Sequence, residues 1–288
     1  MKWTAGSRDN IEDARSQTGF GGGGMRMGGL GLGGLLLVLV LSWATGVDFL
    51  SLLGTDSVSN SPSVSTDGGE LRTTPEEEKL VDFVDAVMRD AQETWQDKLR
   101  GRYQPTRAVI FRDGIQSRCG FAQSATGPFY CPGDSLVYLD LGFFAELRER
   151  FRAPGDFAQA YVLAHELGHH VQHLLGIESQ VRQMQQARPD QQNALSVRLE
   201  LQADCLAGVW AHQAAQPGRA ALGKVELEAG DLEEGLNAAA SIGDDRMQRM
   251  AGQRVAPDRF THGSAEQRVS WFRRGFERGD IEACQTFQ

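Results

Sequence analysis

Apolar residues recur every three or four positions through most of the chain after residue 74, which is typical of amphipathic helices. The first of these segments has a clear start. Thr74 can cap a helix, Pro75 suits the first helical position, and Glu77 would complete a capping box. Gly101 ends this helix at about residue 100. The same spacing predicts further helices at residues 142–151, 156–175, 179–186, 190–214, 224–241 and 264–278.

Short runs rich in β-branched and aromatic residues interrupt the helical pattern between residues 107 and 141. Residues 107–111 and 135–141 read RAVIF and SLVYLDL, and residues 127–131, GPFYC, could form a third short strand. Turns rich in Gly and Pro separate these runs. We therefore predict an α+β fold, in which a mostly helical domain carries one small antiparallel sheet.

One apolar run near the start of the chain has a different character. Residues 27–47, between Arg26 and Asp48, carry no charge and are numerous enough for one membrane crossing. Basic residues dominate before this run and acidic residues follow it, which predicts a cytoplasmic N-terminus. A cleaved signal peptide is the alternative. We favour an uncleaved anchor, because the leader is long, contains acidic residues and lacks a clear cleavage site.

This anchor predicts how the chain is divided. Residues 1–26 would be a cytoplasmic tail and residues 27–47 a transmembrane anchor. Residues 48–74, rich in Ser, Thr, Gly and Asp, would be a flexible linker, and residues 75–288 the folded domain outside the cytoplasmic membrane. The net charge of −9 and the lack of a run of basic residues argue against nucleic acid as a partner.

All four cysteines lie on the predicted exported side, where disulfides persist. Of the three possible pairings, we favour Cys119–Cys131, which closes a hairpin-like segment, and Cys205–Cys284, which ties the C-terminal region to a predicted helix. Four free thiols are the alternative. A zinc site built from these cysteines is not favoured, because no CxxC pair exists.

The predicted helix at 156–175 carries four of the six histidines, in the stretch AYVLAHELGHHVQHLLG. His165, Glu166 and His169 form an HExxH motif. Residues four apart share one helix face, so the two imidazoles could hold one metal ion while Glu166 acts as a base. A chance match and a buried structural histidine are the alternatives. A di-iron site would need a second ExxH element, which the chain lacks. His170 and His173 lie off the metal face.

A third ligand is available on the predicted helix at 190–214, in the stretch RLELQADCLAGVWAH. Glu200 could bind the metal, and Asp204, four residues later, could accept a hydrogen bond from a ligand histidine. A solvated acidic face is the alternative. The helix is largely apolar, however, and buried carboxylates need partners.

His262 stands alone in a Gly-flanked loop before the last predicted helix. It could hydrogen-bond the oxyanion of a tetrahedral intermediate. A loop histidine without a role is the alternative.

These motifs resemble the neutral zinc metallopeptidase family of bacterial single-pass membrane proteins. The resemblance covers nearly the whole chain and is most specific in the central blocks CGFAQSATGPFYCPGDSLVYLDLGFF, AYVLAHELGHHVQ, RLELQADCLAGVWA and THGSAEQR. More distantly, HExxH followed by ExxAD is similar to the gluzincins, although the membrane peptidases of that wider group usually carry several spans. The resemblance implies a mostly helical, gluzincin-like domain in the bacterial cytoplasmic membrane.

The same resemblance implies roles for individual residues. One Zn²⁺ per chain would be held by His165, His169 and Glu200, with Glu166 as general base. Asp204 would support the site, and His262 would stabilise the oxyanion. Arg268 would lie near the site, in contact with substrate or with Glu200.

We therefore expect a membrane-anchored zinc metallopeptidase that hydrolyses peptide bonds of a peptide or protein substrate outside the cytoplasmic membrane. A strand around Leu136–Asp140 could align the substrate by β-addition. Two alternatives stay open, a zinc-stabilised binding or scaffold module without catalysis and a hydrolase of a non-peptide amide. The sequence does not predict the oligomeric state or the particular substrate.

Overall fold

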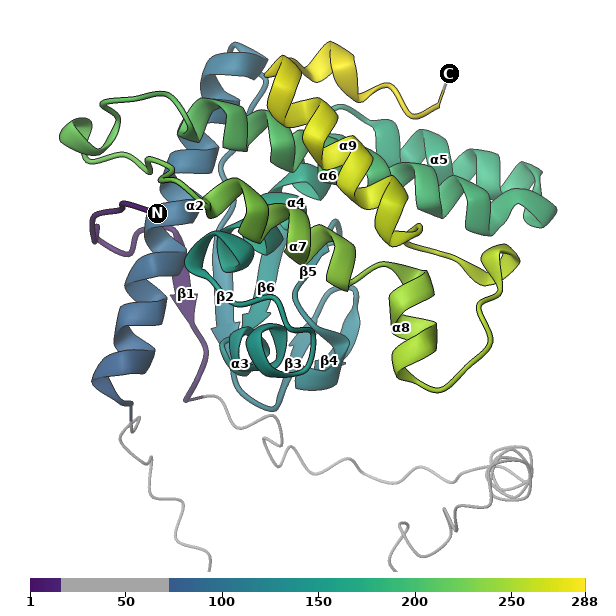
Figure 1. The fold of residues 1–288 in the computed structure, drawn as a ribbon, viewed down its shortest axis with the longest axis horizontal. Coiled ribbons are helices and arrows are strands. Elements are labelled where there is room, and N and C mark those ends of the chain that lie inside the picture. The colour runs from purple at the N-terminus through teal and green to yellow at the C-terminus, as the bar shows by residue number, and fades with distance from the viewer. Residues whose placement is uncertain (17–72, 288) are drawn as a thin grey trace, which may run out of the picture. The chain divides into compact units, whose positions relative to one another are not determined.

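The computed structural model describes residues 1–16 and 73–287, which belong to one compact unit (Figure 1). Its strands are β1 (Ile11–Asp13), β2 (Ala108–Phe111), β3 (Gly114–Ser117), β4 (Gly120–Gln123), β5 (Phe129–Cys131) and β6 (Leu136–Asp140). Its α-helices are α2 (Pro75–Leu99), α3 (Gly142–Glu149), α4 (Asp156–Leu174), α5 (Ile177–Ala187), α6 (Gln192–Ala214), α7 (Asp231–Ser241), α8 (Asp244–Met250) and α9 (Ala265–Arg278). A short 3₁₀ helix, η6 (Ile281–Cys284), follows α9.

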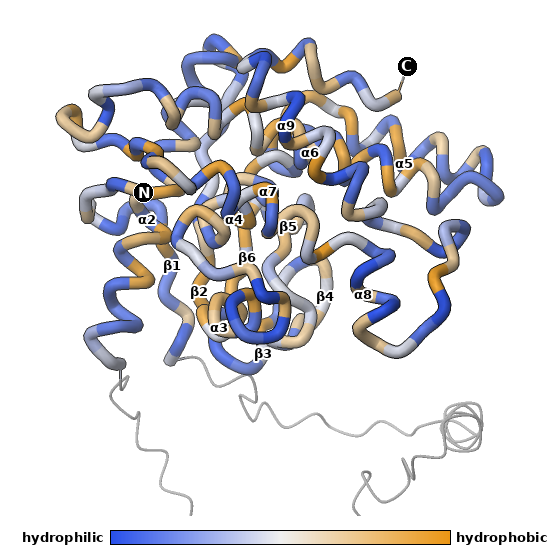
Figure 2. The backbone as a smooth tube through the Cα atoms, in the orientation of Figure 1, coloured by the Kyte–Doolittle hydropathy of each residue, from blue (hydrophilic) through white to orange (hydrophobic). Residues whose placement is uncertain are grey.

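The strands form two sheets. The larger sheet has the order β1-β2-β6-β5, with β1, β2 and β6 parallel and β5 antiparallel to β6, while β3 and β4 form a separate hairpin. The prediction of one antiparallel sheet was therefore wrong. The continuous apolar runs in β2 and β6 are typical of parallel strands covered on both faces, and both strands appear as apolar segments in Figure 2.

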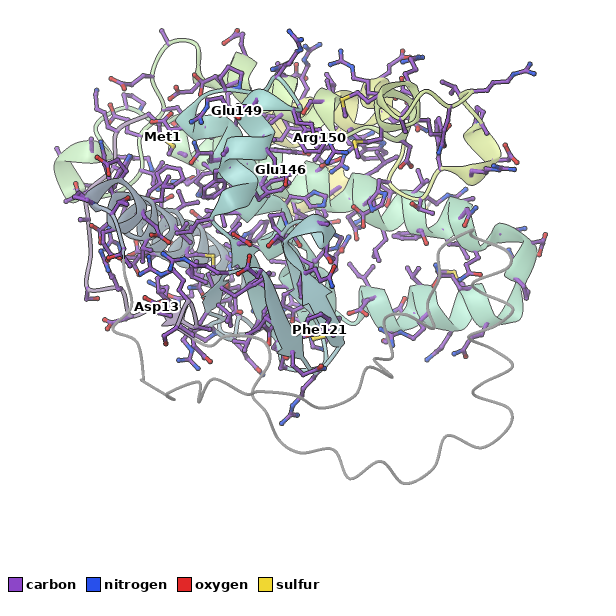
Figure 3. The ribbon with its side chains drawn as sticks, turned by 90° about the horizontal axis from the view of Figure 1, so that it is seen from below. Met1, Asp13, Phe121, Glu146, Glu149 and Arg150 are labelled. Carbon is purple, nitrogen blue, oxygen red and sulfur yellow. A yellow bond between two sulfur atoms is a disulfide. The ribbon has the colours of Figure 1, made fainter. Side chains whose placement is uncertain are left out.

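The two faces of the larger sheet are covered by different elements. Ala108, Ile110, Val137 and Leu139 face a core shared with α2 and α4. The alternate residues of β2 and β6 face a smaller cluster under the β3–β4 hairpin, because successive side chains of a strand point to opposite faces. Phe121 of this hairpin is 51% exposed (Figure 3). The helix α4 is thus held between the sheet and the other helices.

The predicted helices are largely confirmed, with differences at their ends. Thr74 caps α2 by accepting from the Glu77 amide at 3.2 Å, but the Glu77 carboxylate accepts from Arg112 at 2.6 Å instead of completing a capping box. The helix predicted at 224–241 starts only at Asp231, after Gly230 with its φ of 100°. The hydrophilic helix α8 was not predicted.

Both favoured disulfides are confirmed. Cys119–Cys131 joins the β3–β4 turn to β5, and Cys205–Cys284 joins α6 to η6, with Cα–Cα distances of 5.8 and 5.5 Å. They fasten two elements that border the predicted metal site, the strand β5 and the helix α6.

Residues 1–16 do not form the separate tail that the sequence predicted. β1 pairs in parallel with β2, and residues 1–16 belong to the same unit as the helices. The domain is therefore larger than residues 75–288. The predicted anchor at 27–47 and residues 48–72 of the predicted linker lie outside the described residues. Within the part that is described, no helix has the length and apolar character needed to cross a membrane.

Candidate metal centre and catalytic cleft

Three side chains from α4 and α6 converge on one point. His165 and His169 lie one turn apart on α4, and their Nε2 atoms are 3.2 Å from each other. Glu200 of α6 places Oε2 at 3.2 Å from His165 Nε2 and Oε1 at 3.4 Å from His169 Nε2. The two helices can approach this closely because residue 168 is glycine: a Cβ there would lie 2.9 Å from the Ala203 carbonyl oxygen.

The hydrogen bond of the second nitrogen of each imidazole shows why the two Nε2 atoms and the Glu200 carboxylate fit a cation. His165 Nδ1 lies 2.9 Å from Asp204 Oδ1, and His169 Nδ1 lies 2.8 Å from Gln172 Oε1. Both partners accept hydrogen bonds, so each Nδ1 carries the proton and each Nε2 presents a lone pair beside the Glu200 carboxylate. Three such acceptors are stable together around a positive charge.

The spacing of these atoms is compatible with a tetrahedral metal site. Ligand atoms at about 2.05 Å from a tetrahedral Zn²⁺ lie about 3.3 Å apart. The observed separations, 3.2 Å between the two Nε2 atoms and 3.2 and 3.4 Å from them to Glu200 Oε2 and Oε1, are close to that spacing. Burial lowers the pKa of His165, but the Asp204 carboxylate and the hydrogen bonds to Asp204 and Glu200 outweigh it and raise the pKa to about 10. The surroundings of His165 therefore favour a bound positive charge.

Asp204 supports the site from behind His165, as predicted. Its carboxylate is fully buried and accepts from the Arg268 Nε and a terminal Arg268 nitrogen, both at 2.9 Å. The Tyr161 hydroxyl also donates to Asp204. Burial raises the pKa of Asp204, yet the charges of Arg268 and His165 hold that pKa below its usual value. Arg268 therefore bonds Asp204 and not Glu200, and it also lines the cleft, so the expected contact with substrate stays a prediction.

Gln172 is a supporting residue that sequence reasoning missed. Its Nε2 donates to the Leu199 carbonyl at 2.7 Å and to Gln202 Oε1 at 3.1 Å, which turns its Oε1 toward His169. Gln172 lies three residues after His169 on the same helix face, and this spacing could have predicted the contact.

Glu166 lies in the cleft beside the two histidines and is 7% exposed. Burial raises the pKa of its carboxyl group, while the nearby His165 and His169 and the Tyr130 backbone amide act in the opposite direction. A carboxyl group with a raised pKa accepts and releases a proton near neutral pH more readily than an exposed one.

The histidines outside the metal face, His170 and His173, hold strand β5 through Tyr130. His170 Nε2 lies 2.7 Å from the Gln104 carbonyl, so it donates there and His170 Nδ1 accepts from the Tyr130 hydroxyl at 3.0 Å. His173 Nδ1, 2.6 Å from the same hydroxyl, must then donate to it. These hydrogen bonds hold β5 against α4, next to Glu166.

His262 lies at the rim of the same cleft, with its side chain 54% exposed. Asp244, the first residue of α8, holds this loop: its Oδ2 accepts from the amides of Thr261, His262 and Gly263 at 2.6–3.0 Å. Asp244 Oδ1 lies 3.3 Å from His262 Nδ1, and this bond raises the pKa of His262. Asp244 was also missed, because α8 itself was not predicted.

The cleft has a volume of about 760 Å³ and contains all the predicted catalytic and metal residues. Its walls also include apolar side chains from β5, α3, α4 and the α7–α8 region, namely Phe129, Phe143, Val162, Ile242 and Met247. Glu146 and Arg150 border it from α3 (Figure 3). The strand predicted to align a substrate, β6, lies inside the sheet, so it has no open edge. β5 is one of the two edge strands, and Phe129 and Tyr130 of β5 line the cleft.

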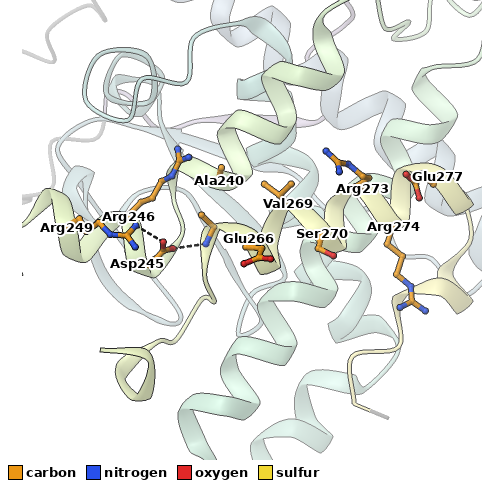
Figure 4. Close-up of a pocket in the computed structure, with 11 residues that line it drawn as sticks. Ala240, Asp245, Arg246, Arg249, Glu266, Val269, Ser270, Arg273, Arg274 and Glu277 are labelled. Atoms are coloured by element: carbon orange, nitrogen blue, oxygen red, sulfur yellow. Dashed lines mark hydrogen bonds and ion pairs between the residues drawn. The ribbon is translucent and has the colours of Figure 1, made fainter. Parts of the chain in front are cut away.

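A second cavity, of about 730 Å³ between α8 and α9, has a different character (Figure 4). Four arginines face three acidic residues there, and Arg249 pairs with Asp245 at 2.8 Å. Its lining shares no residue with the catalytic cleft. The cluster of His165, His169 and Glu200 therefore lies in the first cleft and not in this cavity.

Comparisons with known proteins agree with this geometry. A family model described as "Putative neutral zinc metallopeptidase" matches residues 1–287. The chain is 46% identical over 297 residues to the uncharacterized protein YpfJ of Escherichia coli (strain K12), covering 100% of this chain and 99% of that protein. It is 43% identical over 197 residues to an uncharacterized protein of Mycobacterium tuberculosis (strain H37Rv), covering 67% and 66% of the two chains. No solved structure gives a significant match.

Proposed function

Because the chain belongs to this zinc metallopeptidase family, we propose that it is an active zinc-dependent peptidase of peptide or protein substrates. The observation that carries the proposal is the convergence of His165, His169 and Glu200, with ligand atoms 3.2–3.4 Å apart, beside the buried Glu166. One zinc ion would be held by these three side chains.

The residues around the ion have separate tasks in peptide hydrolysis. When bound, Zn²⁺ supplies Lewis acidity that polarises the scissile carbonyl and acidifies a water molecule. Glu166 takes the proton of the attacking water and passes it to the leaving amine. His262, held by Asp244, donates a hydrogen bond to the developing oxyanion. Asp204 and Gln172 keep the two imidazoles in the tautomer that presents Nε2.

Strand β5 would align the substrate. It is an edge of the larger sheet and lines the cleft. An extended peptide can add to such an edge through backbone hydrogen bonds. We propose further that the domain works outside the cytoplasm, because its two disulfides persist in oxidising compartments.

The test compares the purified full-length chain with two variants of equal size, Glu166→Gln and Glu200→Gln. Zinc content is measured by elemental analysis, and cleavage is followed on a mixture of peptides by mass spectrometry. We expect about one zinc per chain in the wild type and in Glu166→Gln, much less zinc in Glu200→Gln, and cleavage by the wild type alone.

Each other result has a definite meaning. Full zinc occupancy without cleavage of any peptide or small amide would favour the scaffold alternative. Hydrolysis of small amides but not of peptides would favour the second alternative. Unchanged zinc content in Glu200→Gln would show that the third ligand is misassigned.

A further inference from the structure

The described N-terminal segment, residues 1–16, is bound to the first turns of α2 by ion pairs of two arginines. Arg8 contacts Asp82 and Glu78, each at 2.6 Å. The Arg15 side chain is 1% exposed and contacts Asp13 at 2.6 Å and Glu78 at 2.9 Å. A buried arginine that loses its partners leaves an uncompensated charge, so Arg15 favours the bound arrangement.

Backbone pairing and polar contacts hold the same segment independently. Ile11, Glu12 and Asp13 pair with residues 108–110 of β2, and the Ala14 amide donates to the Ile110 carbonyl at 2.8 Å. Asn10 adds a side-chain bond of 3.0 Å to Asp85, which lies fully buried on α2. Trp3 packs edge-on against Phe83 with ring centroids 5.6 Å apart.

The sheet needs this segment. Without β1, the apolar strand β2 would become an open edge, and unpaired apolar edges are sites of aggregation. Glu77 and Glu78 would also lose the buried Arg15. Residues 1–16 are therefore a structural part of the domain.

We propose that residues 1–16 and the domain of residues 73–287 face the same compartment. A single crossing would place β1 and β2 on opposite sides of a hydrocarbon layer about 30 Å thick. Strands pair at about 4.8 Å. The end of β1 and the start of α2 also lie side by side (Figure 1), joined by Arg15 and Glu78. The chain thus leaves and re-enters the domain at one place.

The test labels two engineered thiols in cells that carry the full-length protein. Ala5→Cys reports on the N-terminal segment, and Leu222→Cys, at a residue 74% exposed, reports on the domain. Native cysteines in the described residues are disulfide-bonded, so they do not compete. A membrane-impermeant maleimide is added to intact spheroplasts and to lysed cells, and labelling is read by mass spectrometry.

We expect Ala5→Cys and Leu222→Cys to be labelled together in intact spheroplasts. Labelling of both only after lysis would also support one shared compartment, while contradicting the exported location proposed above. Labelling of Leu222→Cys in intact spheroplasts but of Ala5→Cys only after lysis would overturn the inference. None of these readings depends on peptidase activity.

A third variant tests whether the segment stays docked. Ala14 is 1% exposed under β1 and β2, so a thiol at Ala14→Cys should react at least tenfold more slowly than one at Ala5→Cys in the native detergent-solubilised chain. Equal rates in a protein whose far-UV spectrum is native would show that the segment is not bound, and would also overturn the inference.

Discussion

The hydrogen-bond partners of the ring nitrogens divide the four histidines of α4 into two pairs. Asp204 and Gln172 accept from the metal-facing pair, His165 and His169, whereas His170 and His173 exchange hydrogen bonds with Tyr130. Two of the imidazoles on this apolar helix face the proposed cation site, and the other two hold the strand beside it. Both functions rest on buried acceptors that a sequence pattern does not display.

Replacing Gln172 by leucine should weaken zinc binding about tenfold, because His169 loses the acceptor that fixes its tautomer. The affinity is measured by competition with a zinc chelator. Gln180→Leu, an exposed residue of α5, is the matched control and should leave the affinity unchanged. An unaltered affinity in Gln172→Leu would contradict the supporting role.

Replacing Tyr130 by phenylalanine should lower the free energy of unfolding by about 1–3 kcal/mol, because the buried His170 Nδ1 loses its donor. Urea denaturation measures the change. Tyr138→Phe removes a bond to the partly exposed Asp134 and should cost less. A larger loss for Tyr138→Phe would contradict the role assigned to the Tyr130 hydroxyl.

Helical spacing was enough to expect His165 and His169 on one face with Glu166 beside them, and the structure brings Glu200 to the same place. The spacing of Asp204 from Glu200 also predicted a hydrogen bond to one of the two histidines, and the structure shows that this is His165. Asp244 and Tyr130 reach the site from elements whose positions depend on tertiary packing. Local spacing carries no information about such contacts, so these residues appeared only in the structure.

At the scale of elements, two close helix contacts set the geometry of the site. α4 meets α6 at Gly168, and α6 meets α9 at Gly208 and Gly275, where added Cβ atoms would collide with backbone. The first contact brings Glu200 to the histidines, and the second brings Arg268 to Asp204. The sequence predicted these helices but not their separations, because a glycine inside a helix does not identify its neighbour.

Replacing Gly275 by alanine should destabilise the protein by about 3 kcal/mol, because the new Cβ would lie 1.9 Å from the Cys205 carbonyl oxygen. Thermal or urea unfolding checks this value. Ser270→Ala, on the exposed side of α9, is the control and should stay within about 0.5 kcal/mol of the wild type. Equal stability of the two variants would contradict the close α6–α9 contact.

At the scale of the whole molecule, the predicted boundary at residue 75 was wrong for a physical reason. A segment of mixed polar residues such as 1–16 has no strong periodicity of apolar positions. The sequence therefore did not predict a strand there, and the structure shows one only because it pairs with β2. The prediction of a separate tail at residues 1–26 rested on the apolar run at 27–47 that follows it. Long-range pairing, rather than local pattern, decides that residues 1–16 belong to the domain.

Docking of residues 1–16 should weaken in acid. The hydrogen bond from Arg8 lowers the pKa of Glu78, and the bond from Arg15 lowers the pKa of Asp13. A carboxyl group whose pKa is lower when docked contributes stability above its ordinary pKa, 4.5 or 3.8 here, and loses it as the pH falls through the docked value. The facing charged groups are Arg8, Arg15, Arg112, Glu77 and Asp82.

Hydrogen exchange of the β1 peptide measures this loss. Protection should be constant between pH 6 and 8 after correction for intrinsic rates, and should fall below about pH 4 before the helices open. Simultaneous loss of protection in β1 and α4 would contradict a separate acid-sensitive contact.

The two outer strands of the larger sheet also affect how the protein behaves at high concentration. β1 and β5 are three residues long; β1 ends in Glu12 and Asp13, and Pro128 and Pro132 flank β5. Acidic side chains repel a second copy, and proline lacks the amide that would extend a ladder. In the described part of the chain, the edges of this sheet are therefore too short and too interrupted for two copies to join their sheets, although the edge of β5 is long enough for a few residues of a bound peptide.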